Sequence, residues 1–230
     1  MTGARKTKVQ AIIFDIDDTL SDWETSIERA LVEVMPDVPG EQRNGVRGRL
    51  RRAIADQMFV VRDGIVVNRH YWMFLVDPIP PWRAALPGSP EVAAAVAQRF
   101  RSLLKPVPFA DAAPALEELR LRYALGVLTN NPRSEETLAG LGLRQYFDCV
   151  VSAPEEHRKP DPEAFRLACA AMSVAPAQAA YVGDSLADDV EGATRAGLLA
   201  VWLDRRGDGG EPPKGACRIT SLEQLPGVFA

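Results

Sequence analysis

Three carboxylates follow an apolar run near the start of the chain. The run, Val9 to Phe14, is too short to cross a membrane and is typical of a buried strand. Asp15, Asp17 and Asp18 then fall within four residues. Like charges this close repel one another, so a metal ion or a cationic partner must offset them. The alternative is an acidic turn in which Asp18 caps the element that follows.

Asp15 and Asp17 are two residues apart. Along a continuing strand their side chains would point to the same side. Two carboxylates presented to one place form a candidate site for a hard cation such as Mg2+, which prefers oxygen ligands.

Two later apolar segments also end in polar groups. Ala124 to Leu128 runs into Thr129 and Asn130, and Ala179 to Val182 runs into Gly183 and Asp184. In a parallel α/β sheet, ligands bind at the carboxyl ends of the strands. We therefore expect Asp15, Thr129 and Asp184 to meet at one edge of the sheet.

The elements that position these residues alternate between strands and helices, which predicts an α/β fold with a doubly wound parallel sheet. Further strands are expected at 149–151 and 199–203, and helices at 115–121, from about 134, at 164–172 and at 186–196. Asp161 and Pro162 predict the start of the third of these helices, and Gly197 the end of the fourth. Ser221 is expected to cap a last short helix.

The segment from 21 to 108 interrupts this alternation and is too long for a simple crossover. We interpret it as an inserted, mainly helical domain, with the catalytic core formed by 1–20 and 109–230. It contains a basic stretch, Arg43 to Arg52, and it carries a net positive charge within a chain of net charge −4. Val60-Val61 and Ile65–Val67 flank Asp63-Gly64, which predicts either a short hairpin or two helices joined by a turn. The aromatic residues Tyr71, Trp72 and Phe74 are expected in the core of the insert.

Composition is that of an ordinary globular protein: 230 residues, 47% hydrophobic and 25% charged. The net charge of −4 argues against nonspecific nucleic-acid binding. Cys149, Cys169 and Cys217 lie far apart, which argues against a disulfide framework or a zinc site and favours a reducing cytoplasm. No segment is long and apolar enough to predict a membrane span, so we expect no membrane association. No pattern indicates an oligomeric state.

Four motifs in order resemble the haloacid dehalogenase superfamily, in the group with a helical cap inserted after the first strand. They are Asp15-x-Asp17-x-Thr19, the strand ending at Thr129 with Asn130, Lys159 before a helix, and Gly183-Asp184 with Asp189 five residues after that Asp. Each motif alone is modest, but all four together in plausible strand contexts are a strong signal. The resemblance covers essentially the whole chain.

The resemblance implies a Mg2+-dependent phosphatase acting on a small phosphorylated metabolite. Asp15 would attack phosphorus to form an aspartyl-phosphate, and Asp17 would serve as general acid and base. Mg2+ would be held by the Asp15 and Asp184 carboxylates and the Asp17 backbone carbonyl, with Asp189 either binding the metal or orienting its ligands. Phosphate oxygens would be bound by Thr129, the Asn130 amide and Lys159.

Other functions remain open at this point. A dehalogenase of the same superfamily lacks the acid two residues after the nucleophile, which here is Asp17. A phosphosugar mutase keeps both acids and has the same core motifs. From other classes come a phospho-accepting receiver module, which is about half this length, and a non-catalytic binding protein, in which loss of Asp15 or Asp17 would be expected. A sugar phosphate, phosphoglycolate and a nucleoside monophosphate all suit the core as substrates.

Overall fold

The computed structural model describes residues 8–36, 40–62, 65–68, 79–86, 89–207 and 209–229. The chain divides into two compact units. The first comprises Met1–Trp23 and Pro106–Ala230, and the second is Glu24–Lys105. The predicted aromatic group around Tyr71 lies outside the described residues.

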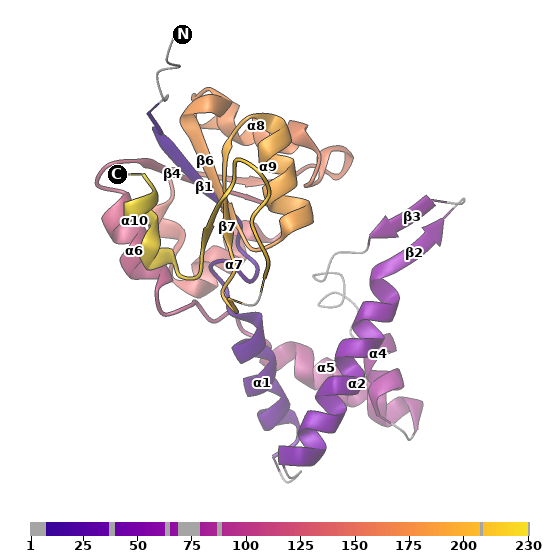
Figure 1. The fold of residues 1–230 in the computed structure, drawn as a ribbon. Coiled ribbons are helices and arrows are strands. Elements are labelled where there is room, and N and C mark those ends of the chain that lie inside the picture. Colours follow the sequence, from indigo (N-terminus) through magenta and orange to yellow (C-terminus); the bar gives the residue numbers. More distant parts are fainter. Residues whose placement is uncertain are drawn as a thin grey trace. The chain divides into compact units, whose positions relative to one another are not determined.

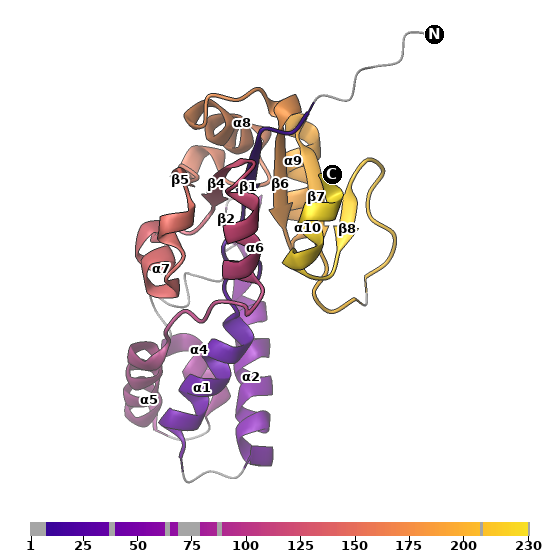
Figure 2. The ribbon, with the colours of Figure 1, turned by 90° about the vertical axis from the view of Figure 1, so that its left-hand side faces the viewer.

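The first unit is built on a six-stranded sheet in which every pair of neighbouring strands is parallel. Figure 1 labels β1, β4, β6 and β7 of this sheet, and the full strand order, β5-β4-β1-β6-β7-β8, can be followed in Figure 2. The predicted strands are confirmed as β1 (Ala11–Phe14), β4 (Ala124–Thr129), β5 (Cys149–Ser152), β6 (Ala179–Gly183) and β7 (Leu199–Leu203). Sequence analysis missed β8 (Cys217–Ile219), because its three residues include Arg218 and form no apolar run.

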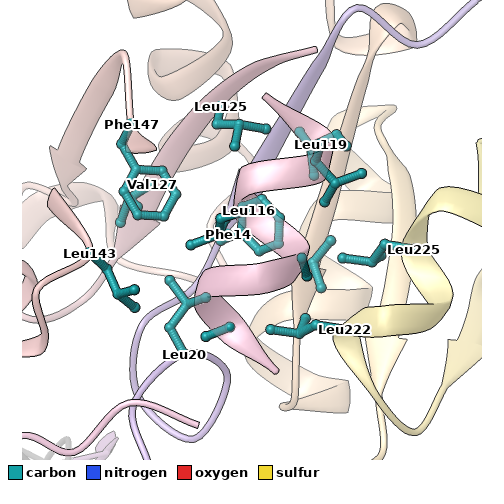
Figure 3. Packing of buried hydrophobic residues seen from close by; sticks show 14 of the residues in the cluster. Phe14, Leu20, Leu116, Leu119, Leu125, Val127, Leu143, Phe147, Leu222 and Leu225 are labelled. Atoms are coloured by element: carbon teal, nitrogen blue, oxygen red, sulfur yellow. The ribbon is translucent and has the colours of Figure 1, made fainter. Parts of the chain in front are cut away.

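Both faces of this sheet are covered by helices, as a doubly wound fold requires. Ile12 and Phe14 pack into one hydrophobic cluster with α6 (Ala112–Leu119), α7 (Ser134–Leu141) and α10 (Leu225–Val228). Ile13 belongs to another cluster with α8 (Pro162–Ala171) and α9 (Glu191–Ala196). The alternation follows from the two-residue period of a strand. Figure 3 shows Phe14 beneath Leu116 of α6, with Leu222 and Leu225 beside them, and α6 and α10 are neighbours in Figure 2.

Local signals place the helix ends. Asp161 is the N-cap of α8 and accepts a hydrogen bond from the Glu163 amide, and Pro162 is the first helical residue, as predicted. Gly197 ends α9 at φ +88°, a left-handed conformation that favours glycine. The predicted helix 186–196 is in fact two elements, because a π-helical turn, Leu186–Val190, precedes α9. Four short 3-10 helices complete the unit: Arg144–Tyr146, Glu155–His157, Pro176–Gln178 and Leu222–Gln224, the last capped by Ser221 as expected.

The second unit is mainly helical. It contains α2 (Gly40–Met58), α4 (Ile79–Ala85), α5 (Pro90–Leu103) and all of α1 (Trp23–Val34) except its first residue. β2 (Phe59–Arg62) and β3 (Ile65–Asn68) pair antiparallel, so the hairpin is the correct alternative. Trp82 and Phe100 meet edge to face in the core, with ring centroids 5.0 Å apart. Among the described residues, no helix combines the length and the apolar character that a membrane span requires.

Candidate active site

Three strand ends bring the predicted polar groups together. β1 lies between β4 and β6, so Asp15, Thr129 and Asp184 follow or end three adjacent strands at their carboxyl ends. The amide of Asp15 donates to the Val182 carbonyl at 2.9 Å, which extends the pairing of β1 by one residue. Carboxylate oxygens of Asp15, Asp184 and Asp189 lie within 4.8 Å of one another. The topology therefore gathers a cluster of acids at the switch point of the sheet.

Lys159 is the buried cation that faces these acids. Its Nζ donates to Asp15 Oδ1 at 2.6 Å, to Asp189 Oδ1 at 2.6 Å and to the hydroxyl of Tyr181 at 2.8 Å. Burial disfavours the charged ammonium, but Asp15 and Asp189 outweigh it and raise the pKa of Lys159 well above its ordinary value. Lys159 is therefore a permanent positive charge, and its three N–H donors already have acceptors within the protein.

Asn130 fixes the loop that carries this lysine. The Lys159 amide donates to Asn130 Oδ1 at 2.9 Å, and Asn130 Nδ2 returns a bond to the Lys159 carbonyl at 3.0 Å. The Arg158 guanidinium also donates to the Asn130 main-chain carbonyl. The hydroxyl of Thr129, which is 1% exposed, accepts from the Asn131 amide at 3.2 Å. The side chain of Asn130 thus joins two loops.

The electrostatics of the acid cluster fit a hard cation. Burial, opposed by Lys159 and aided by the charges of Asp189 and Asp17, raises the pKa of Asp15 to about 7. The pKa of Asp184 is also raised well above its ordinary range. Burial is the largest cause, and repulsion from Asp189 and Asp15 adds to it. The Asp184 carboxylate accepts a bond of 3.4 Å from the Thr19 hydroxyl. Lys159 offsets only part of the negative charge of the cluster. The remaining carboxylate oxygens are the kind of ligand that Mg2+ prefers.

Asp189 differs from the other two acids because both of its oxygens have protein donors. Oδ1 accepts from Lys159 and lies 3.2 Å from the Tyr181 hydroxyl oxygen, whose proton is donated to the Leu128 carbonyl at 2.8 Å, while Oδ2 accepts from the Ser185 amide at 3.0 Å. A side chain at Gly183 would place its Cβ only 2.3 Å from Asp189 Oδ2, so the Gly-Asp motif needs its glycine for this close approach. These bonds hold Asp189 against the lysine and the loop after β6.

Asp17 is not one of the three close carboxylates, although its charge interacts with those of Lys159 and Asp189. Asp15 and Asp17 were expected to point to the same side if the strand continued through Asp17. The strand does not continue, because β1 ends at Phe14 and Asp18 turns the chain at φ +57°. The Asp17 carboxylate instead accepts from the indole N–H of Trp23 at 2.7 Å and hydrogen-bonds the Asn131 side chain. Burial raises the pKa of Asp17 against the effect of these donors. The two acids of the first motif therefore lie in different surroundings.

Several residues that position the site were missed by sequence analysis. Tyr181 was assigned only to an apolar strand, and its hydroxyl reaches Lys159. The indole of Trp202, on β7, donates to the main-chain carbonyl of Asp184 at 3.0 Å. Both aromatic residues lie in apolar strand segments, so the sequence predicts only that they are core residues and not that they contact the site.

Arg205 was also missed, since it lies in a polar segment after β7 that is typical of a solvated loop. It donates to the Thr19 carbonyl at 2.7 Å and forms two bonds of 3.0 and 3.1 Å to Asp111. Its guanidinium also lies 3.6 Å from the ring centroid of Phe109. Arg205 thus restrains the loop from which the Thr19 hydroxyl reaches Asp184.

Comparison with known proteins identifies the family and several relatives of the chain. Residues 9–197 match the family described as haloacid dehalogenase-like hydrolase. A glyceraldehyde 3-phosphate phosphatase from Methanopyrus kandleri is 30% identical over 216 residues, which cover 86% of this chain and 84% of the relative. A phosphoserine phosphatase from Thermus thermophilus is 42% identical over 123 residues, a match that covers 51% of this chain and 49% of that protein. The crystal structure of a HAD phosphatase from Thermococcus onnurineus matches with a TM-score of 0.64 at 29% identity, covering 96% and 98% of the two chains.

Proposed function

The chain belongs to the haloacid dehalogenase-like hydrolase family, and we propose that it is a Mg2+-dependent phosphatase. It would hydrolyse a small phosphate monoester through an aspartyl-phosphate intermediate. The observation that carries this proposal is the different set of partners of two acids two residues apart. Asp15 contacts Lys159 within the acid cluster, whereas the Asp17 carboxylate accepts a hydrogen bond from the neutral indole of Trp23.

In the first half of the proposed reaction, a carboxylate oxygen of Asp15 attacks phosphorus. The bond from Asp15 to phosphorus forms as the bond from phosphorus to the ester oxygen breaks, and Asp17 gives its proton to the leaving oxygen. In the second half, a water molecule attacks the phosphorus of the aspartyl-phosphate, and Asp17 takes the proton from that water. The Asp15 carboxylate leaves, so both acids return to their starting states and inorganic phosphate is released.

Lys159 supports this chemistry as a fixed charge. Its pKa is raised well above the ordinary value, so it stays protonated throughout the working pH range. Because its three N–H groups are directed to Asp15, Asp189 and Tyr181, its main contribution is to orient Asp15 and to offset negative charge at the phosphate. Thr129 and the Asn130 amide are proposed to bind phosphate oxygens.

The metal is proposed to bind the Asp15 and Asp184 carboxylates and the Asp17 backbone carbonyl. When bound, Mg2+ offsets the repulsion between an anionic nucleophile and an anionic phosphate. Asp189 is proposed to orient Lys159 and the loop after β6 instead of binding the metal, because both of its oxygens already accept protein hydrogen bonds.

The inserted segment 21–108 is proposed to act as a cap that selects the substrate. A core that handles only a phosphate group cannot distinguish the rest of a metabolite, so discrimination requires another surface. We also propose a cytoplasmic location. Its support is the three cysteines, Cys149, Cys169 and Cys217, all of which are free thiols.

The direct test is phosphate release from an aryl phosphate and from a broad panel of phosphometabolites, with Mg2+ and with a chelator. We expect hydrolysis that depends on Mg2+, and an Asp184→Asn variant that needs far more Mg2+ or is inactive. Full activity of the wild-type enzyme in excess chelator would overturn the metal-dependent mechanism. A metabolite that is isomerised without phosphate release would indicate a mutase.

A further inference from the structure

Asp17 has a specific partner that the reaction scheme leaves unexplained. The indole N–H of Trp23 donates to Asp17 Oδ1 at 2.7 Å, a short bond for a neutral donor. Trp23 is only 8% exposed, and it is the first residue of α1. We propose that Trp23 is a positioning residue that directs the Asp17 carboxyl group for proton transfer to the leaving group. This inference rests on the proposed function, in which Asp17 is the general acid.

The backbone alone does not set the direction of the Asp17 side chain. β1 has ended at Phe14, and the chain turns at Asp18, whose amide donates to the Ser21 carbonyl at 3.0 Å. The Asp17 carboxylate is also outside the acid cluster of Asp15, Asp184 and Asp189. Side-chain donors must therefore hold it, and proton transfer requires a placement within hydrogen-bond reach of the ester oxygen.

An indole suits this task because of its chemistry. Trp Nε1 is a donor and has no acceptor capacity, so it cannot take the proton that Asp17 must deliver. A donor bound to Oδ1 requires that oxygen to act as an acceptor, which favours the acid proton on Oδ2. The Asn131 side chain also hydrogen-bonds the carboxylate, but its Nδ2 donates to the Thr137 hydroxyl at 3.4 Å as well, and its Oδ1 accepts from the Arg133 amide at 2.9 Å. Trp23 is thus the donor with the defined short contact.

This role makes a prediction that simple packing does not. If Trp23 directs the acid, its loss matters most for an ester whose leaving group must be protonated. An alkyl phosphate has such a leaving group, whereas a nitrophenolate leaves with little need of a proton. A tryptophan that only fills space would affect both esters alike, because a disturbed fold lowers every rate.

The experiment uses Trp23→Phe, which keeps an aromatic ring and removes the N–H. Single-turnover release of nitrophenol from 4-nitrophenyl phosphate measures phosphorylation of the enzyme alone, and kcat/KM is measured on the best alkyl phosphate of the panel. We expect kcat/KM on the alkyl ester to fall by about 10- to 100-fold, part of the 10²- to 10⁴-fold usual for general acid–base catalysis. The nitrophenol phase is expected to change by less than about threefold.

Trp202→Phe is the matched control, because it also removes one indole N–H, in this case the one bonded to the Asp184 carbonyl. Trp202→Phe is expected to raise the Mg2+ concentration that the enzyme requires and to lower the rates of hydrolysis of both esters by a similar factor. Trp23→His restores a ring N–H and is expected to recover part of the alkyl-ester rate. Should Trp23→Phe lose the folded state, the same ratio of rates is measured in Trp23→Leu.

Equal losses on the two esters in the Trp23 variants, or no loss on either, would overturn the inference while leaving the phosphatase assignment intact. Asp17→Asn provides the benchmark, since it should show the same ester selectivity in stronger form. If Asp17→Asn lacks that selectivity, the acid role of Asp17 fails. If the wild-type protein releases no phosphate from any ester, the proposed function fails. Either of these results removes the inference as well.

Discussion

The hydroxyl of Tyr181 on β6 donates to the main-chain carbonyl of Leu128 on β4 at 2.8 Å, although β1 lies between those strands. The same oxygen accepts from Lys159 Nζ. One side chain therefore joins the two strands on either side of Asp15 and also helps to hold the lysine that contacts Asp15. The bonds are buried, so each group would be costly to leave without a partner.

Tyr181→Phe is expected to lower the free energy of unfolding by about 1–3 kcal/mol, the usual cost of unsatisfied buried polar groups. It removes an acceptor from the Lys159 ammonium and a donor from the Leu128 carbonyl. Urea unfolding measures the change. The control is Tyr146→Phe, because within the described residues the Tyr146 hydroxyl makes no hydrogen bond. Equal stability of the two variants would contradict the bridging role.

The stability of the metal-free protein is expected to fall as pH rises from about 4 to 7. Asp15 has a folded pKa of about 7 against an ordinary value of 3.8, so between these values the folded state binds more protons than the unfolded state. Unfolding is therefore favoured by raising the pH, and the raised pKa of Asp184 acts in the same direction.

Because Mg2+ competes with protons for the carboxylates, its effect on Tm is expected to be larger at pH 8 than at pH 5. Thermal unfolding in chelator and in excess Mg2+ at the two pH values measures this difference. In Asp184→Asn the Mg2+ shift should shrink at pH 8. The prediction fails if Mg2+ raises Tm equally at both pH values.

The two acids of the first motif are expected to fail in different ways. Asp15→Asn removes the nucleophile and should abolish both phosphoenzyme and product. Asp17→Asn keeps the nucleophile, so turnover should fall by roughly 10²–10⁴-fold while an activated aryl ester still forms some phosphoenzyme. Acid-quenched labelling and steady-state turnover measure the two effects. Near-normal turnover in Asp15→Asn, with complete loss in Asp17→Asn, would reverse the assignment.

The basic helix α2 is expected to influence substrate preference through Arg52. Arg52 is exposed, whereas Arg47 contacts Glu24 and Glu28, and Arg49 donates to the Ala85 carbonyl at 2.7 Å. Arg52→Ala should raise KM for the best metabolite with little change on a small aryl phosphate.

Arg47→Ala serves as the comparison for this test. It breaks ion pairs within the second unit, so it should lower thermal stability and affect both substrates alike. A lack of any effect of Arg52→Ala on either substrate would indicate that this face of α2 is simply solvated.

The residue patterns were enough to predict every strand of the sheet except β8 and to indicate the family. Apolar runs of strand length and helical periodicity predict β1, β4, β5, β6 and β7, because burial on both faces leaves a continuous apolar signal. Polar residues stand at or directly after the strand ends at Asp15, Thr129 and Asp184, a pattern that predicts a site at that edge of the sheet. The order of these motifs along the chain was sufficient to indicate the superfamily.

The contacts that hold these groups became visible only in the folded structure. Trp23, Tyr181 and Trp202 each combine an apolar ring with one polar atom. In a sequence, the ring is enough to explain such a residue as part of the hydrophobic core, so the role of the polar atom is not predicted. Their N–H and O–H groups donate to Asp17, Leu128 and Asp184, respectively, which are 6, 53 and 18 residues away in the sequence. Likewise, the separate surroundings of Asp15 and Asp17 depend on where β1 ends and how Asp18 turns. Such contacts depend on the three-dimensional packing of distant elements, which local residue patterns do not encode.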